Sequence, residues 1–305
     1  MTTEPAIAVS GLRKSYDEFE AVRGINLTIP VGQVFAILGP NGAGKTTTVE
    51  ILEGYRERSA GEVSVLGRDP SSPTRDWRER IGIVLQDCEL QPLLTVRESL
   101  QMYAGYYRSP RDIEETIELT GLAHKADERA GKLSGGQKRR LDVALALIGD
   151  AELVFLDEPT TGFDPEARRE AWNAIASMRE LGKTIVLTTH YMEEAQFLAD
   201  QVAVFARGEV VAEGTPDEIG GRGELPTKIA FKLPARIAAS DLPPAFRGAV
   251  EGKRVTIETP NPTATLNELT GWAVERAVEL EDLSVNRPSL EDIYLQLTRA
   301  AEEEE

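Results

Sequence analysis

The chain has 305 residues, 41% of them hydrophobic, enough for a full-sized globular domain and a smaller second one. Its 34 Lys and Arg stand against 51 Asp and Glu, and the formal net charge of -17 argues against general binding to nucleic-acid backbones. The single cysteine, Cys88, excludes an internal disulfide and every metal cluster built on cysteines.

Neither a secretion signal nor a membrane span is predicted. Segment 1–11 has no basic start and no apolar core of signal-peptide length. The best apolar stretch, 143–156, is broken by Asp150 and Glu152, and a spanning helix needs about 18 apolar residues or more. We therefore expect a cytosolic protein that does not cross a membrane by itself.

Short β-like segments with turn residues between them fill the first 70 positions. The segment 34–38 is wholly apolar and runs into a glycine-rich loop, which is typical of a strand buried on both faces before a loop and a helix. The helix is expected from near Lys45. The other predicted strands are 7–9, 25–29 and 62–66, with turns at Gly11, Gly32, Gly61 and Gly67.

Helical patterns dominate from Thr95 to Gly149, and β-like runs return after them. This order predicts an α/β core interrupted by a helical subdomain of about 87–149. The helices are expected from 96, over 112–121, over 137–148 and over 165–181, and the strands at 81–85, 153–156, 184–188 and 202–205.

A composition shift at 214–226 predicts a turn, a short helix and a Gly-rich linker. We expect a first domain over 1–220 and a small α+β domain over 227–305, with a solvated acidic end at 302–305. Within the second domain the predicted elements are strands at 229–233 and 255–257, a helix near 265–276 and a last helix from Ser289.

A phosphate-binding loop with the spacing G-x-x-x-x-G-K-T lies directly after the apolar strand. Its glycines let the backbone N–H groups face phosphate, and the following helix adds its positive end. Lys45 supplies a compact charge to the β- and γ-phosphates, and the Thr46 hydroxyl is a predicted Mg²⁺ ligand. The residues expected to bind ATP here are Gly39, Asn41, Gly42, Gly44, Lys45, Thr46 and Thr47.

Two carboxylates follow the apolar run 153–156, at the strand end where ligands of an open α/β sheet bind. We expect Asp157 to hold hydrated Mg²⁺ and Glu158 to polarise the attacking water, as phosphoryl transfer to water requires. Acidic residues at strand ends also act as simple caps, and the phosphate loop upstream favours the catalytic interpretation.

Three further side chains are candidates for the same site. His190 follows another apolar strand and could hydrogen-bond the γ-phosphate or the attacking water, although a lone histidine is usually structural. Gln86 ends the run 81–85, and its amide could reach the metal or its water; it could equally form a loop hydrogen bond. Tyr16 offers a ring for adenine stacking, against a plain packing role.

Taken together, six motifs in order resemble those of the ATP-binding subunits of ABC transporters, over residues of about 5–220. GPNGAGKTT resembles the Walker A loop, LVFLDE Walker B, Gln86 the Q-loop glutamine, LSGGQKRR the signature, PTTGFDP the D-loop and TTH the switch histidine. The resemblance implies a P-loop NTPase core with an N-terminal antiparallel β region and a helical signature subdomain.

By this resemblance, Ser134, Gly135, Gly136 and Gln137 would contact ATP held by a second copy of the chain, and Asp164 would lie in a D-loop that crosses the dimer interface. Small residues at a helix N-terminus do form an anion site. Without the resemblance, the same residues are a helix cap with Ser134 as the capping residue, and both interpretations can hold. Phe163 stands where the family usually has leucine, which affects interface packing.

The closer likeness is to ATPases of the drug and polyketide exporter branch, which act with separately encoded type-2 permeases. It includes RPSLEDIYLQLT at 287–298, whose Leu290, Ile293, Tyr294 and Leu297 form one apolar helix face. That face either packs on the chain's own second domain or holds two copies together. The segment 88–100, in the helical subdomain, could dock a permease helix, although core packing explains Val96 and Leu100 equally well.

The expected function is therefore ATP hydrolysis with Mg²⁺ in a homodimer that drives export of a drug-like, antibiotic or lipid substrate through a permease at the inner face of the cell membrane. Lys45, Gln86, Glu158 and His190 would carry the catalysis. A soluble ABC-type ATPase and a purely regulatory nucleotide-binding module are the alternatives. Intact Lys45, Glu158 and His190 argue against the regulatory module.

Overall fold

The computed structural model of the chain describes residues 4–84, 90–221, 225–234, 236–287 and 289–295. They form two compact units, the first ending at Pro216 and the second beginning at Asp217. Among the helices in these ranges, none combines the length and the apolar character that crossing a bilayer demands.

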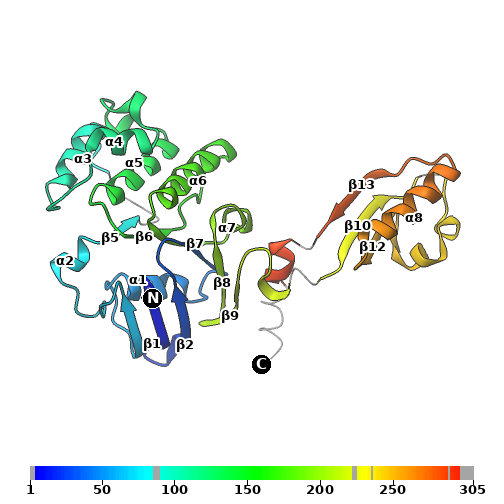
Figure 1. Cartoon of the computed structure of the whole chain (residues 1–305), viewed down its shortest axis with the longest axis horizontal. Helices are drawn as coiled ribbons and strands as arrows, with labels where there is room; N and C mark the ends of the chain where they lie inside the picture. The colour runs from blue at the N-terminus through cyan, green and yellow to red at the C-terminus, as the bar shows by residue number, and fades with distance from the viewer. Residues whose placement is uncertain (1–3, 85–89, 222–224, 235, 288, 296–305) are drawn as a thin grey trace. The chain divides into compact units, whose positions relative to one another are not determined.

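A mostly parallel six-stranded sheet forms the centre of the first unit, in the order β5-β6-β7-β3-β8-β9 (Figure 1). The strands are β3 (Val34–Leu38), β5 (Ile81–Val84), β6 (Leu153–Asp157), β7 (Thr184–Thr189), β8 (Gln201–Ala206) and β9 (Glu209–Gly214). Every residue of β3 and β7 is buried, as predicted for strands covered on both faces. Because β3, β5, β6, β7 and β8 run parallel, their carboxyl ends meet at one edge of the sheet.

A separate antiparallel sheet is ordered β2-β1-β4. Its strands are β1 (Ile7–Tyr16) and β2 (Phe19–Ile29), which come before β3 in the chain, and β4 (Ala60–Val65), which comes after α1. The predicted turns at Gly11 and Gly61 are wrong, since both glycines lie inside strands. Their φ angles are 58° and 91°, and a Cβ on Gly61 would lie 2.4 Å from the Gly11 carbonyl oxygen. Glycine is needed there for close backbone approach at an irregular register, so the strands continue through it.

The helical subdomain has its own apolar core, which includes Val96, Leu100 and Leu141. Its helices are α3 (Val96–Ala104), α4 (Ile113–Leu119) and α5 (Gly135–Leu147), which Figure 1 shows grouped apart from β1 and β2. The other helices of this unit are α1 (Lys45–Leu52), α2 (Arg75–Arg78), α6 (Pro165–Glu180) and α7 (Met192–Leu198). The positions of α1, α3, α4, α5 and α6 agree with the prediction within a few residues.

The second unit is a four-stranded antiparallel sheet, ordered β11-β12-β10-β13, with one long helix. Its elements are β10 (Thr227–Lys232), β11 (Val250–Glu251), β12 (Arg254–Thr259), α8 (Pro262–Glu275) and β13 (Glu281–Asn286). Residues 290–295 are helical after Ser289, whose hydroxyl accepts from the Asp292 N–H. Leu290 and Ile293 are buried, whereas Leu297 lies outside the described residues.

Candidate nucleotide site

The phosphate loop connects β3 to α1, as predicted. Gly44 caps α1 with φ 91°, and a Cβ there would lie 2.5 Å from the Ala21 carbonyl oxygen, so the position accepts only glycine without backbone movement. Lys45 is only 5% exposed, and its Nζ donates to the carbonyl oxygens of Gly39 (2.8 Å) and Pro40 (3.1 Å). Burial lowers the pKa of Lys45, while the nearby carboxylates of Glu158 and Asp157 act in the opposite direction.

A pocket of about 490 Å³ opens over this loop and joins it to the N-terminal β region. Tyr16 lies at its edge, 37% exposed, with Lys14 Nζ 5.1 Å and Arg56 Cζ 5.3 Å from the ring centroid. Phe19 and Ala21 also line the pocket; no motif in the sequence pointed to them. The full lining is Tyr16, Phe19, Ala21, Asn41, Gly42, Gly44, Lys45, Thr46, Thr47 and Glu158.

The carboxylates at the end of β6 lie beside the end of β7. Thr188 donates its hydroxyl to Asp157 Oδ1, and its carbonyl oxygen accepts from the Glu158 N–H at 3.1 Å. Glu158 Oε2 accepts from Thr161 Oγ1 at 3.0 Å, and its Oε1 lies 3.4 Å from His190 Nδ1. The structure therefore places Glu158 and His190 side by side, as two parallel strand ends predict, while the role of Thr188 carried no sequence signal.

The residues present fit a magnesium ion bound with ATP. Thr46 offers a hydroxyl in the pocket, and Asp157 offers a half-buried carboxylate. Hard oxygen donors of this kind, few in number, suit Mg²⁺, which keeps several waters and shares the phosphates. Gln86, the third predicted ligand, lies outside the described residues.

The signature segment opens α5 on a capping box, in which Ser134 Oγ accepts from the Gln137 N–H and Gln137 Oε1 accepts from the Ser134 N–H. Ser134 and Gly135 are exposed, and apart from its own chain neighbours and helix backbone nothing lies within 4 Å of where a Gly135 Cβ would stand. Among the described residues that line the 490 Å³ pocket, none comes from 134–137. Ser134 thus caps its helix, as predicted, and leaves its outer side open.

Asp164 caps α6, its Oδ1 accepting from the N–H groups of Glu166 (3.0 Å) and Ala167 (2.9 Å). A Cβ on Gly136 would lie 3.1 Å from the Ala167 Cβ, so this glycine also serves close packing of α5 on α6. The D-loop and signature segments are therefore neighbours within one chain.

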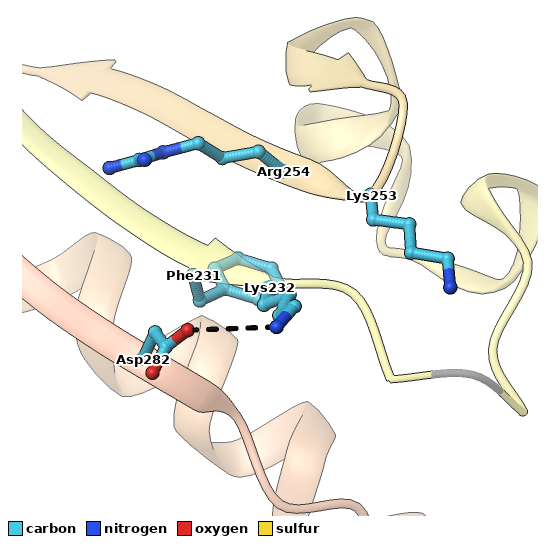
Figure 2. Close-up of a pocket in the computed structure, with 5 residues that line it drawn as sticks. All are labelled: Phe231, Lys232, Lys253, Arg254 and Asp282. Atoms are coloured by element: carbon cyan, nitrogen blue, oxygen red, sulfur yellow. Dashed lines mark ion pairs between the residues drawn. The ribbon is translucent and has the colours of Figure 1, made fainter.

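A second pocket, of about 350 Å³, lies in the second unit and is lined by Phe231, Lys232, Lys253, Arg254 and Asp282. Figure 2 shows the Lys253 and Arg254 side chains extending away from one another, and Lys232 Nζ lies 4.0 Å from Asp282 Oδ2. These cations do not converge on one point, so the loop of the first unit remains the candidate nucleotide site.

A phosphate loop at the carboxyl end of the buried parallel strand β3, with two carboxylates at the carboxyl end of β6 two strands away, defines a P-loop nucleotide-binding protein. Comparison with known families identifies which family of P-loop proteins this is. Residues 22–161 match the model of the ABC transporter family, and 227–289 match a C-terminal domain of ABC transporter domain-containing proteins. The chain belongs to the ATP-binding proteins of the ABC transporter family.

Two curated relatives match nearly the whole chain. Nod factor export ATP-binding protein I of Rhizobium sp. (strain N33) is 39% identical, over 96% of this chain and 97% of that protein. Daunorubicin resistance ATP-binding protein DrrA3 of Streptomyces coeruleorubidus is 37% identical, over 97% and 96%.

Solved structures agree with the fold of the first unit. The cbiO1 protein of Clostridium perfringens, part of an ABC transporter complex, is 33% identical over 71% of this chain and 90% of its own, with a TM-score of 0.63. An ATP-binding cassette solved as a dimer in a post-hydrolysis state with ADP and Pi is 26% identical over 68% and 98%, with a TM-score of 0.61.

Proposed function

We propose that this chain is the ATP-hydrolysing subunit of an ABC exporter and that two copies close on two ATP molecules. The observation that carries the proposal is the composition of the pocket: it holds the phosphate loop and Glu158, whereas the open signature end at Ser134 lies outside its described lining. A site with one half missing and an unused anion-binding helix end on the same chain support a dimer with shared sites.

In the proposed reaction, water attacks the γ-phosphorus, its proton passes toward Glu158, and the bond to the β-phosphate oxygen breaks. Lys45 neutralises charge on the β- and γ-phosphates, and His190, 3.4 Å from Glu158, orients the water or the γ-phosphate. Thr46 and Asp157, with Gln86 as the third predicted ligand, would hold Mg²⁺, which when bound would supply further charge neutralisation. Ser134, Gly135 and Gly136 of the second copy donate to the γ-phosphate, with Gln137 and Asp164 beside them.

For the membrane partner we propose a type-2 permease, one helix of which docks in a groove of this chain between the sheet and the helical subdomain. The groove measures about 530 Å³, and Ile83, Tyr103, Tyr107 and Leu145 give it an apolar wall. Glu50 and Asp142 line it too, together with Glu53, whose pKa is raised to about 8 by burial, so that Glu53 is mainly uncharged at neutral pH. The occupant that fits is an amphipathic helix with basic residues beside its apolar face.

The segment predicted to dock the permease divides in two. Val96 and Leu100 are fully buried, so they pack in the core of the helical subdomain. Leu93 is 75% exposed and remains a candidate contact for the permease. Cys88 lies outside the described residues. Binding of the permease here would hold the chain at the cytoplasmic face of the membrane.

The relatives' names suggest the cargo class. One is named for export of Nod factor and another for daunorubicin resistance. We propose a drug-like, antibiotic or lipid substrate for the exporter served by this chain.

The second unit is proposed to hold the dimer together or to regulate it. Burial of Leu290 and Ile293 favours packing of the last helix on its own chain over a contact between copies through that face.

The test compares the wild-type chain with Glu158→Gln, alone and with a type-2 permease from the same organism in proteoliposomes. We expect the wild type to hydrolyse ATP and to drive uptake of a fluorescent drug, and the variant to bind ATP without turnover. Hydrolysis by Glu158→Gln at the wild-type rate would remove Glu158 as the base. Hydrolysis without any permease-dependent transport would favour the soluble ATPase.

A further inference from the structure

The peptide that carries Glu158 is held in an unfavourable conformation. Glu158 has φ 44°, in the left-handed region that non-glycine residues rarely adopt. A conformation of this kind costs about 1–3 kcal/mol and persists only where surrounding contacts enforce it. Here, contacts from α5 and α7 enforce it.

One constraint comes from the helix that begins at the signature. Arg139, on α5, is 6% exposed and reaches the loop after β6, where its Nε donates to the Pro159 carbonyl oxygen at 3.0 Å. Its Nη2 donates to the Asp157 carbonyl oxygen, also at 3.0 Å. The planar guanidinium therefore bridges the carbonyl groups on both sides of Glu158.

The second constraint comes from α7, the helix after His190. Glu194 is 0% exposed, and its Oε1 accepts from Thr160 Oγ1 at 2.8 Å and from Trp172 Nε1 at 3.0 Å. Burial raises the pKa of Glu194, although the groups that donate to it act in the opposite direction. Thr160 lies two residues after Glu158, so Glu194 fixes the far end of the same loop against α7.

We propose that Arg139 and Glu194 are positioning residues that jointly hold Glu158 in its strained, water-facing conformation beside His190. Neither residue lines the nucleotide pocket among the described residues, so their effect is on the rate of the chemical step and not on ATP binding. The inference rests on the proposed ATPase function.

Arg139 carries a further consequence for the dimer. It lies on the helix whose first turn, at Ser134, would contact the ATP held by the other copy, and it bonds to the loop that carries Glu158 of its own chain. The ATP held by one copy is therefore connected, through α5 of the second copy, to Glu158 of that second copy. Loss of Arg139 should lower the Hill coefficient for ATP as well as the rate.

The first experiment measures kcat, KM and Kd for ATP in Glu194→Ala and Glu194→Gln of the full chain. We expect kcat to fall about 10- to 100-fold in Glu194→Ala, with KM and Kd within about threefold of wild type, because small displacements of a catalytic group have effects of this size. Glutamine keeps an acceptor for Thr160 and Trp172, so Glu194→Gln should recover most of kcat. If Glu194→Ala fails to fold, Thr160→Val, which replaces the hydroxyl with a methyl group, takes its place and should also lower kcat.

The control on the same helix is Leu198→Ala, which removes buried packing of α7 without touching the Glu194 contacts. It should lower the melting temperature and leave kcat per folded molecule near wild type. If Leu198→Ala lowers kcat as strongly as Glu194→Ala, the effect of Glu194 is general loosening of α7 and the positioning role is wrong.

The second experiment pairs Arg139→Met with Val143→Ala, a buried packing control on α5. Arg139→Met should lower both kcat and the Hill coefficient, whereas Val143→Ala should change neither. The double variant Arg139→Met/Glu194→Ala should lower kcat by less than the product of the two single fold-changes, since both residues act on one loop. Unchanged kcat in both Arg139→Met and Glu194→Ala, in a wild-type enzyme that hydrolyses ATP, overturns the proposal and leaves the ATPase function intact. A wild-type chain without ATPase activity overturns both.

Discussion

Two glycines of this chain, Gly44 and Gly61, lie where one backbone segment passes too close to another for a side chain. Gly44 at the start of α1 and Gly61 in β4 both have positive φ, and a Cβ at either would meet a carbonyl oxygen within 2.5 Å. Gly44 shapes the phosphate loop, whereas Gly61 shapes only the β sheet. The pair shows that one steric requirement serves binding in one place and folding in another.

Gly11 and Gly61 offer a matched test of that requirement. Gly11 has φ 58° with open space around its Cβ position, so Gly11→Ala should cost only the left-handed strain, about 1 kcal/mol. Gly61→Ala adds overlap with backbone and should cost about 2–4 kcal/mol. Urea unfolding with an unchanged m-value measures both. Equal losses would mean that the close approach at Gly61 relaxes freely.

The second residue-scale prediction concerns the aromatic edge of the pocket. If Tyr16 stacks on adenine, Tyr16→Ala should raise KM for ATP about 10-fold with kcat nearly unchanged, and Tyr16→Phe should behave as wild type. Phe19 lines the same pocket and is the alternative ring. A large KM effect for Phe19→Ala with none for Tyr16→Ala would transfer the stacking role to Phe19.

At the scale of elements, the buried parallel strands could be predicted, whereas the edge strands β9 and β13 could not. β3, β6 and β7 are continuous apolar runs that end in chemistry-bearing residues, so their position and the meeting of Glu158 with His190 followed from the sequence. β9 and β13 are half-exposed or exposed, and neither has a long apolar run, so the sequence did not predict them. The Arg139 and Glu194 contacts depend on tertiary packing between α5, α7 and the loop after β6, which a motif does not encode.

The groove formed by β5, α3 and α5 gives the element-scale prediction. Ile83 is 42% exposed on β5, and Ile83→Asp places a charge in the apolar wall that would receive the permease helix. We expect loss of co-purification with the permease from detergent-solubilised membranes. Val274→Asp, on the exposed surface of α8, is the matched control and should co-purify normally. Equal recovery of both variants would place the permease elsewhere.

At the scale of the whole molecule, every described residue that lines the nucleotide pocket belongs to the first unit. The second unit has its own sheet, helix and apolar core, built on Ile229, Phe231, Val255 and Leu269. Nucleotide chemistry and the function of the second unit are therefore separable in principle. The proposed dimerisation by ATP would belong to the first unit, since both halves of the proposed shared site, Lys45 and Ser134, lie there.

The most direct measurement is the mass of Glu158→Gln by sedimentation velocity, with and without Mg-ATP, beside the double variant Glu158→Gln/Ser134→Arg. A shared site requires a dimer that forms only with ATP in the single variant, with one ATP bound per chain, and a monomer in the double variant because arginine blocks the open signature end. A single variant that binds ATP and stays monomeric, or a double variant that dimerises equally well, would contradict the shared site.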